Sequence, residues 1–220
     1  MSVEKKKEFI KKQISEQHGC SVPCVECTKK FQRIDIMEGA HIPVGYWLLN
    51  LKDFHETSKI KDVVKEYTDH LNEQYLNGKS ICFAGTQGTG KTMGSIIILK
   101  KAIANGFSVF YVTANDLLQE VLNSNYDIQF QMKNTDFLVI DELDSRFFYS
   151  ENSKQLFGGI FENIYRQRAH NGLPTILCSN ETDNIMNTFS GQCVQSIESL
   201  NSQYLTIYPI TGTDYRKRRE

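Results

Sequence analysis

One short segment constrains the fold of this chain more than any other. The run before it, residues 80–84, is apolar, and the run after it, 93–104, is amphipathic. In the order strand, glycine-rich loop, helix, the glycines let successive backbone N–H groups approach a phosphate, and the helix presents its positive end to the same anion. The segment fills every position of the pattern G-x-x-x-x-G-K-[ST] and predicts a nucleotide-binding loop made by Gly85, Thr86, Gln87, Gly88, Thr89, Gly90, Lys91 and Thr92.

Two acids downstream complete the pattern of a nucleotide hydrolase. Lys91 is expected to reach the β- and γ-phosphates of ATP, and Thr92 to coordinate Mg²⁺. The apolar run 137–140 leads into Asp141, which would share that Mg²⁺, and Glu142, which would polarise the attacking water. A strand that ends by chance in surface acids is the alternative. Kinases and small GTPases often carry one acid here, so the pair favours an ATPase that binds ATP or ADP with Mg²⁺.

A polar amide follows the next predicted strand. Residues 175–179 are mostly apolar, and Asn180 comes directly after them. Ligands of parallel sheets bind at the carboxyl ends of the strands, where an amide can hydrogen-bond the γ-phosphate or the attacking water. Ser-Asn is also a common turn at the start of a helix. Because Asn180 follows the first predicted strand after the acid pair, we favour it as a catalytic sensor of the γ-phosphate.

Apolar strands alternate with amphipathic helices along most of the chain. Buried strands that alternate with helices predict an α/β fold with a doubly wound parallel sheet. The helix 152–170 is expected to end at Asn171-Gly172. The expected strands are 80–84, 108–113, 137–141, 175–179 and about 204–208, and the expected helices are 3–17, 60–75, 91–104, 115–122, 152–170 and about 183–188.

Composition narrows the class of protein. The chain has 220 residues, 40% of them hydrophobic and 23% charged, with a net charge of −1. This balance argues against a surface that coats nucleic acid, although basic residues cluster at 5–12 and 216–219. No apolar run approaches the roughly 20 residues that span a bilayer. We therefore expect a cytoplasmic protein with no membrane partner.

Four soft ligands lie close together near the N-terminus. His18, Cys20, Cys24 and Cys27 form the pattern H-x-C-x3-C-x2-C. In a cytoplasmic chain such spacing favours structural Zn²⁺ over disulfides. The fourth ligand is open between His18, His41 and a residue of a partner chain, and reduced thiols without a metal are the alternative.

The order of these motifs resembles a known family. The chain is similar to the AAA+ ATPases of the DnaC, DnaI and IstB type, which are replicative helicase loaders and transposition helpers, and the resemblance covers about residues 40–216. The residues that carry it are Ile42-Pro43, Asp53-Phe54, the phosphate loop, Asp141-Glu142, Arg168 ahead of Leu173-Pro174-Thr175-Ile176, Ser179-Asn180, and Gly212-Thr213-Asp214-Tyr215-Arg216.

The resemblance implies a fold, two domains and a further site residue. The fold would be a three-layer P-loop NTPase of the AAA+/ASCE type with a parallel sheet, preceded by a small zinc-binding segment. Residues 1–42 would form the segment that docks a partner, and the corresponding segment binds zinc in some relatives. Residues 43–220 would form the ATPase domain. Arg216 would lie near the nucleotide as a second sensor.

The chain departs from the family at one place. The helix after the sensor strand should carry an arginine that completes the ATP site of a neighbouring subunit, but residues 195–200 contain none. Arg166 or Arg168, or an arginine of the partner, are the candidate replacements.

The resemblance implies a loader that binds and hydrolyses ATP to deliver a replicative helicase onto single-stranded DNA, with self-association through the ATP sites. An ATPase helper of a transposase is the alternative within the same fold. A binding module in which ATP is a structural ligand is another, whereas a small-molecule kinase would need a lid that the sequence lacks. The segment 146–149 combines a basic residue with aromatic ones, which suits either single-stranded DNA or packing in the core.

Overall fold

The computed structural model describes residues 2–55, 58–148, 150–182, 184–212 and 214–215. The chain divides into two compact units, residues 1–49 and 50–220. The first unit includes Ile42-Pro43 and the short 3₁₀ turn Val44–Tyr46 that follows. Each unit is described separately below.

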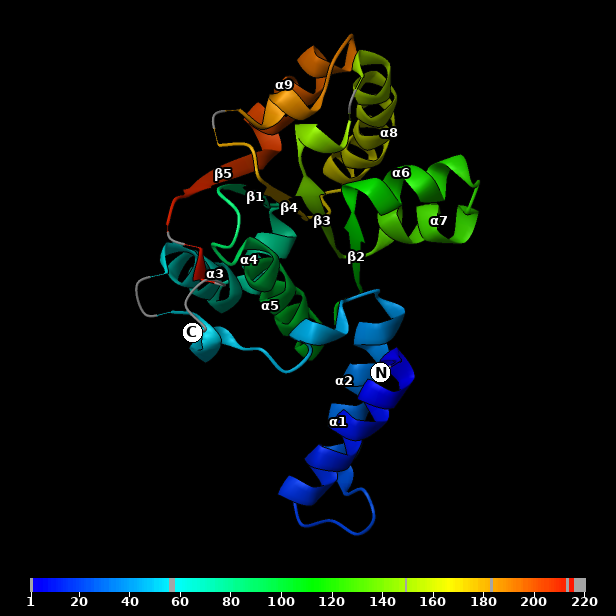
Figure 1. Ribbon diagram of the computed structural model, residues 1–220, viewed down its shortest axis with the longest axis vertical. Coiled ribbons are helices and arrows are strands. Elements are labelled where there is room, and N and C mark those ends of the chain that lie inside the picture. The colour runs from blue at the N-terminus through cyan, green and yellow to red at the C-terminus, as the bar shows by residue number, and fades with distance from the viewer. Residues whose placement is uncertain (1, 56–57, 149, 183, 213, 216–220) are drawn as a thin grey trace. The chain divides into compact units, whose positions relative to one another are not determined.

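The first unit is built on two helices, α1 (Val3–Gln17) and α2 (Val25–Gly39). Figure 1 shows them side by side in blue. Charge pairing joins them, because Asp35 accepts from Lys11 at 2.7 Å and from Lys7 at 3.0 Å, and Lys7 also contacts Glu38. The bounds of α1 confirm the helix expected at 3–17.

The second unit is organised around a parallel sheet of five strands in the part of the chain that the structure describes, in the order β2-β3-β4-β1-β5. The strands β1 to β4 are almost wholly buried, as expected when helices cover both faces of a parallel sheet. The predicted α/β fold with a parallel sheet is confirmed. The strand bounds are β1 (Ser80–Gly85), β2 (Val109–Thr113), β3 (Phe137–Leu143), β4 (Thr175–Ser179) and β5 (Leu205–Ile210).

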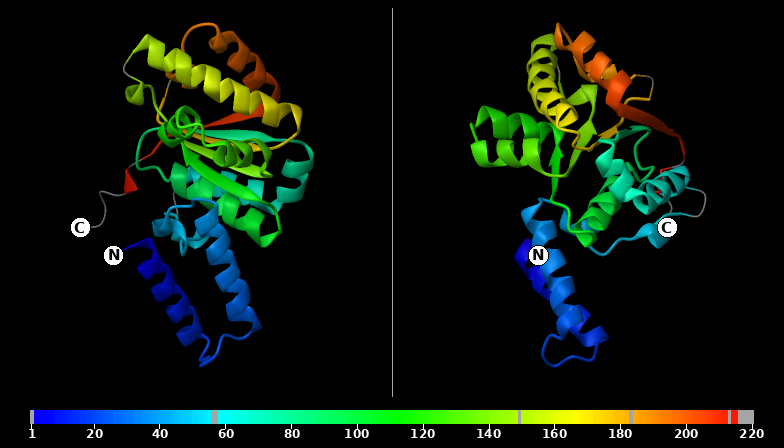
Figure 2. Two further views of the ribbon diagram at one scale, coloured as in Figure 1. Left: turned by 90° about the vertical axis from the view of Figure 1, so that its right-hand side faces the viewer. Right: turned by 180° about the vertical axis from the view of Figure 1, so that it is seen from behind.

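Two layers of helices enclose this sheet (Figure 2). Parallel crossovers are right-handed, so the direction of each step across the sheet decides the face that its helix covers. The step from β1 to β2 runs toward the β2 end of the sheet and places α5 on one face, with α3 packed against it. The later steps run toward the β5 end, so their helices cover the opposite face. The first layer contains α3 (Lys59–Asp69), α4 (Leu71–Leu76) and α5 (Lys91–Ala104), and the second α6 (Ala114–Leu122), α7 (Tyr126–Asn134), α8 (Glu151–His170) and α9 (Cys193–Tyr204).

Several elements differ from the expectation. The helix α2 was not expected, because residues 18–42 were predicted only as the candidate zinc segment. The helix expected at 60–75 is interrupted at His70, whose φ of −109° and ψ of 25° are not helical. The helix α7 was not expected, because it buries Met132 and little else and so lacks a clear apolar period. The expected helix near 183–188 is a short 3₁₀ turn, Ile185–Thr188.

An aromatic cluster fills the core between the sheet and α8. Phe157 stacks on Phe148 with ring centroids 4.3 Å apart and on Phe189 at 5.8 Å. Phe148 belongs to the segment 146–149 and is only 3% exposed, so this ring packs in the core and is not available to stack on a base. Tyr149 lies outside the described residues.

Arg168 is the largest of the fully buried side chains. Its guanidinium donates to the carbonyls of Pro174 at 2.6 Å and Thr135 at 2.8 Å, to those of Met132 and Asp136, and to the Thr175 hydroxyl. It therefore fastens the end of α7 to the starts of β3 and β4. The proposal that Arg168 completes a neighbour's site is wrong, because no part of the side chain reaches the surface.

Arg168→Met should destabilise the protein by about 3 kcal/mol or more, because it leaves several buried carbonyls without donors. Arg166→Met is the matched control on the same helix. Its side chain is 42% exposed and pairs with Glu162, so its loss should cost less than about 1 kcal/mol. Urea unfolding followed by circular dichroism measures both. Equal midpoints for the two variants would contradict this account of Arg168.

Candidate nucleotide site

The phosphate loop adopts a backbone that only glycine tolerates at key positions. Gly88 has φ +77° and Gly90 has φ +92°. A Cβ at Gly85 would collide with the carbonyl oxygen of Ile210 on the neighbouring strand β5. The chain therefore turns closely around a concave row of N–H groups, at the positive end of α5.

Lys91 is held inside this loop. Its ammonium donates to the carbonyls of Gly85 at 2.8 Å and Thr86 at 2.7 Å, and only 7% of the residue is exposed. The Thr89 hydroxyl donates to the Thr86 carbonyl at 3.0 Å and closes the turn. Thr92 follows in the first turn of α5 and is half-buried.

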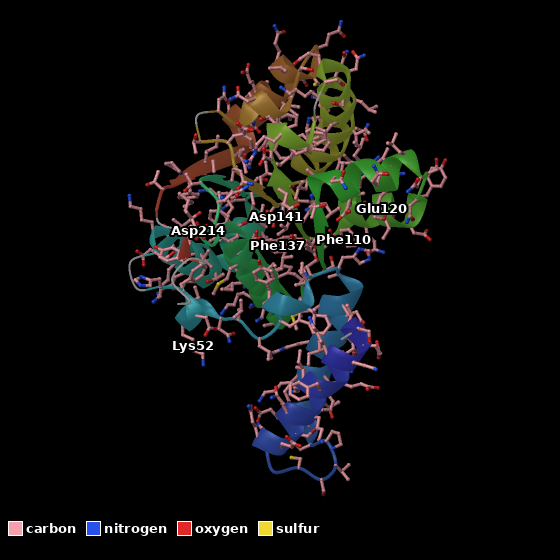
Figure 3. All side chains as sticks on the ribbon, in the orientation of Figure 1. Lys52, Phe110, Glu120, Phe137, Asp141 and Asp214 are labelled. Atoms are coloured by element: carbon pink, nitrogen blue, oxygen red, sulfur yellow. The ribbon has the colours of Figure 1, made fainter. Side chains whose placement is uncertain are left out.

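The acid pair lies near the end of β3, where Asp141 is labelled in Figure 3. Asp141 is buried, and its carboxylate accepts from the Tyr111 hydroxyl at 2.8 Å and from the Glu142 backbone N–H at 2.7 Å. Glu142 is exposed and has φ +59°, a left-handed conformation that is rare for a residue with a side chain. Strain of this kind gathers at functional sites, where it aims a side chain that an ordinary strand would place elsewhere.

Although the residue is exposed, partial desolvation of its carboxyl group and the neighbouring carboxylates raise the pKa of Glu142 above its ordinary value. The carboxylate of Asp141 contributes most among these neighbours, followed by Asp116 and Asp144. A carboxylate with a raised pKa is a better proton acceptor.

Asn180 lies beside the acid pair. Its backbone N–H donates to the Leu143 carbonyl at 3.2 Å, directly after the pairing of β4 with β3. The strand β4 also pairs with β1, which leads into the phosphate loop. The loop, the acid pair and Asn180 therefore lie at or just beyond the carboxyl ends of three adjacent strands, β1, β3 and β4.

The C-terminal segment packs against the phosphate loop. The Tyr215 backbone N–H donates to the Gly88 carbonyl at 3.1 Å, and a Cβ at Gly88 would collide with the Asp214 carboxylate. Asp214 is labelled in Figure 3. The Tyr215 ring also stacks on His55 at 5.2 Å. Arg216, expected as a second sensor, lies outside the described residues.

The four soft ligands of the first unit come together. One ligand atom each from His18, Cys20, Cys24 and Cys27 lies within 4.8 Å of the others. His18 Nδ1 is 3.7 Å from Cys24 Sγ, while its Nε2 lies 3.2 Å from the Glu26 carboxylate. A carboxylate on the far nitrogen of the ring is the usual partner of a metal-bound histidine. Hydrogen bonds, chiefly from the Cys27 backbone N–H and from His18, lower the pKa of Cys24 to about 6. Three sulfurs and one imidazole fit tetrahedral zinc.

Comparison with known proteins defines the family. Residues 53–189 match the family described as IstB-like ATP binding protein. The chain belongs to this IstB-like family. It is 28% identical over 149 residues to an ATP-binding protein of insertion sequence IS5376 from Geobacillus stearothermophilus. That match covers 64% of this chain and 57% of the relative's length.

The IstB-like fold is shared with several solved structures. DnaI matches with a TM-score of 0.65 and 18% identity, over 79% of this chain and 93% of DnaI. A primosome component of Streptococcus pyogenes serotype M3 matches with 0.63 and 17%, over 81% and 96%. The DnaC helicase loader matches with 0.55 and 19%, over 76% and 99%. At these identities the likeness establishes the fold.

Two polar side chains of this IstB-like site were not expected from the sequence. Tyr111 lies within β2 and reaches across to Asp141, and Asp144 follows the acid pair and contacts Asn180. Tyr111 reads in sequence as an ordinary apolar strand residue. The D-E-x-D spacing was the one signal for Asp144, because it places a third acid at the same edge of the sheet.

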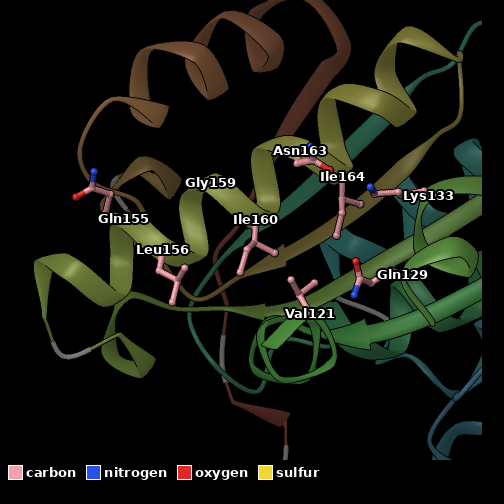
Figure 4. Close-up of a pocket in the computed structure, with 9 residues that line it drawn as sticks. All are labelled: Val121, Gln129, Lys133, Gln155, Leu156, Gly159, Ile160, Asn163 and Ile164. Carbon is pink, nitrogen blue, oxygen red and sulfur yellow. The ribbon is translucent and has the colours of Figure 1, made fainter. Parts of the chain in front are cut away.

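A hollow lies away from these residues, between α8 and the pair α6 and α7 (Figure 4). Apolar side chains are drawn from both sides, and none of the predicted site residues lines it. The lining residues are Val121, Gln129, Lys133, Gln155, Leu156, Gly159, Ile160, Asn163 and Ile164.

Among the residues that the structure describes, no helix has the length and apolar content that crossing a bilayer requires.

The cluster at residues 18–27 should hold one zinc per chain. Removing it with a chelator should loosen α1 and α2 while leaving ATP binding at 85–92 unchanged, because a segment this short depends on the metal for its fold. Elemental analysis of untagged protein and hydrogen exchange of both units test this. Cys24→Ser should lose the metal and Cys193→Ser, far along the chain in α9, should retain it. Wild-type protein without stoichiometric zinc would contradict the assignment.

Proposed function

We propose that this protein is an ATP-dependent helicase loader. The observation that carries the proposal is that a phosphate loop, an acid pair and a polar amide lie at the carboxyl ends of three adjacent strands. Membership of the IstB-like family, which is described as an ATP binding protein, supports the binding of ATP at this edge.

Each side chain has a role in the proposed reaction. Lys91 would leave the loop carbonyls to bind the β- and γ-phosphates, and Thr92 and Asp141 would hold Mg²⁺, which neutralises charge on the transferred phosphoryl group. Glu142 would accept a proton from the attacking water, and Asn180 would hydrogen-bond the γ-phosphate. The tail at Asp214 and Tyr215 would keep the loop closed from the other side.

The partners of the proposed loader are a replicative helicase and single-stranded DNA. The likeness of the fold to DnaI and DnaC supports this choice. Copies of the chain would associate through their ATP sites, and ATP would hold the assembly until hydrolysis releases it. The zinc-bearing first unit is the proposed docking module for the helicase.

A capture experiment tests the partner. The Glu142→Gln variant, loaded with ATP and used as bait in an extract of the native host, should retain the replicative helicase. Lys91→Ala serves as the matched bait that cannot bind ATP. Recovery of helicase by neither bait, or equally by both, would contradict nucleotide-dependent loading.

A second candidate is an ATPase helper of a transposase. The observation that favours it is the relative encoded by an insertion sequence. The same experiment separates the two, because a transposase retained by Glu142→Gln in place of the helicase would support the helper. If nucleotide binding occurs with little hydrolysis under any condition, a nucleotide-dependent binding module replaces both.

A further inference from the structure

A buried carboxylate connects the acid pair to Asn180. Asp144 directly follows β3 and is 2% exposed. Its Oδ2 accepts from Asn180 Nδ2 at 3.2 Å. Its Oδ1 accepts from the Arg146 backbone N–H at 3.0 Å and from the Arg146 side-chain Nε at 2.8 Å. The carboxylate thus joins the amide to a guanidinium that is 64% exposed.

The chemistry of this contact fixes the orientation of the amide. An ionised carboxylate accepts hydrogen bonds and donates none, so Asn180 must turn its NH₂ group toward Asp144. A buried carboxylate is costly unless it is paired, and Arg146 supplies the charge. The Arg146 guanidinium accordingly holds the pKa of Asp144 below its usual range.

Other bonds hold the backbone of the two strand ends. The Ser179 hydroxyl donates to the Leu143 carbonyl at 2.8 Å, and the Ser145 backbone N–H donates to the Glu181 carboxylate at 2.8 Å. The Asn180 backbone N–H also donates to the Leu143 carbonyl, which is the third of these bonds. Because these bonds do not involve the Asp144 side chain, replacing its carboxylate should alter the amide of Asn180 more than the path of the chain.

We propose that Asp144 is a positioning residue for ATP hydrolysis, which orients the Asn180 amide toward the γ-phosphate and is itself held by Arg146. The inference rests on the proposed function, in which Asn180 contacts that phosphate. An amide held in one orientation is available at the transition state without reorganisation, which is where preorganised polar groups act. Asp144 acts on the rate through Asn180 and does not touch the nucleotide.

A double-mutant cycle on the full-length protein tests the proposal. Asp144→Asn should lower kcat roughly tenfold to a hundredfold with little change in KM, as expected for a group that orients a catalytic side chain. Asn180→Ala should cause a loss at least as large. The double variant should fall no further than Asn180→Ala alone, because Asp144 has nothing left to orient. Asp144→Ser provides a second substitution that buries no charge.

Nucleotide binding gives a readout that does not depend on turnover. The preference for ATP over ADP, measured with fluorescent analogues, should shrink in Asp144→Asn and Asn180→Ala alike. The matched control is Asp136→Asn, which alters a carboxylate bonded to Ser108 and Tyr75 at the opposite edge of the sheet. It should change neither kcat nor the preference.

The outcomes separate this inference from the proposed function. If Asn180→Ala loses hydrolysis while Asp144→Asn does not, the positioning role is wrong and the ATPase proposal stands. Losses that multiply in the double variant would likewise overturn it, because they would indicate a general structural role. If Asn180→Ala leaves both rate and preference unchanged, the sensor role and the inference fail together.

Discussion

Glu142→Gln is expected to bind ATP as tightly as the wild type and to lose hydrolysis by a factor of about 10² to 10⁴, the usual contribution of a positioned general base. The amide keeps the size and position of the side chain but no longer accepts a proton from water. Fluorescent ATP binding and single-turnover hydrolysis measure the two effects separately. Equal hydrolysis in Glu142→Gln and wild type would show that another group activates the water.

Two further variants serve as controls for this prediction. Lys91→Ala should lose ATP binding itself, because the removed ammonium is the charge that the loop holds for the phosphates. Glu120→Gln, on α6 and bonded to Asn125, removes a carboxylate away from the site and should behave as wild type. Loss of ATP binding in Glu142→Gln would indicate that its carboxylate is needed for the loop or the metal.

The isolated protein should hydrolyse ATP slowly, and a partner that donates an arginine should raise the rate by about 10³ to 10⁵, the range for arginine fingers supplied in trans. The residues at 195–200 supply no arginine, and Arg168 is buried. Turnover measured over a range of protein concentrations, with and without purified helicase, tests the dependence. Fast hydrolysis that is independent of concentration would contradict any shared site.

Arg166 is the other arginine that the sequence analysis considered for this role. Its guanidinium is 42% exposed, pairs with Glu162 and contacts Ser196 on α9, the helix in which the resemblance expects the missing arginine. If Arg166 acts in trans, mixing Arg166→Ala with Lys91→Ala should recover activity, because one chain keeps its ATP site and the other its arginine. If the mixture stays as slow as either variant, the partner becomes the expected source.

Local sequence patterns were sufficient to predict the main strands and helices of this fold. The helix 91–104 and the strand 175–179 have the predicted bounds, because each has a clear signal at its start and end. The interruption at His70 and the helix α7 were not predicted, since neither changes the apolar pattern of the sequence. The periodicity of apolar residues predicts which residues are buried, and it gives no signal for an element that buries few of them.

The parts of the candidate site that consist of residues adjacent in sequence could be predicted. The phosphate loop and the acid pair are continuous motifs, and strand order brings them together. Arg168 and Asp144 were not predictable in the same way, because a charged residue in sequence reads as a surface residue. Only the tertiary structure reveals the carbonyls around Arg168 and the amide beside Asp144.

The position of β1 has a consequence for the biosynthesis of the protein. This strand leads into the phosphate loop, yet its neighbours in the sheet are β4 and β5, and Ser80 pairs with Leu205. Gly85 itself rests against the carbonyl of Ile210. Contacts this distant in sequence form late. During translation, the phosphate loop is therefore synthesised before the strands β4 and β5 that support it. We expect nucleotide to stabilise the nascent chain only after β5 has emerged from the ribosome.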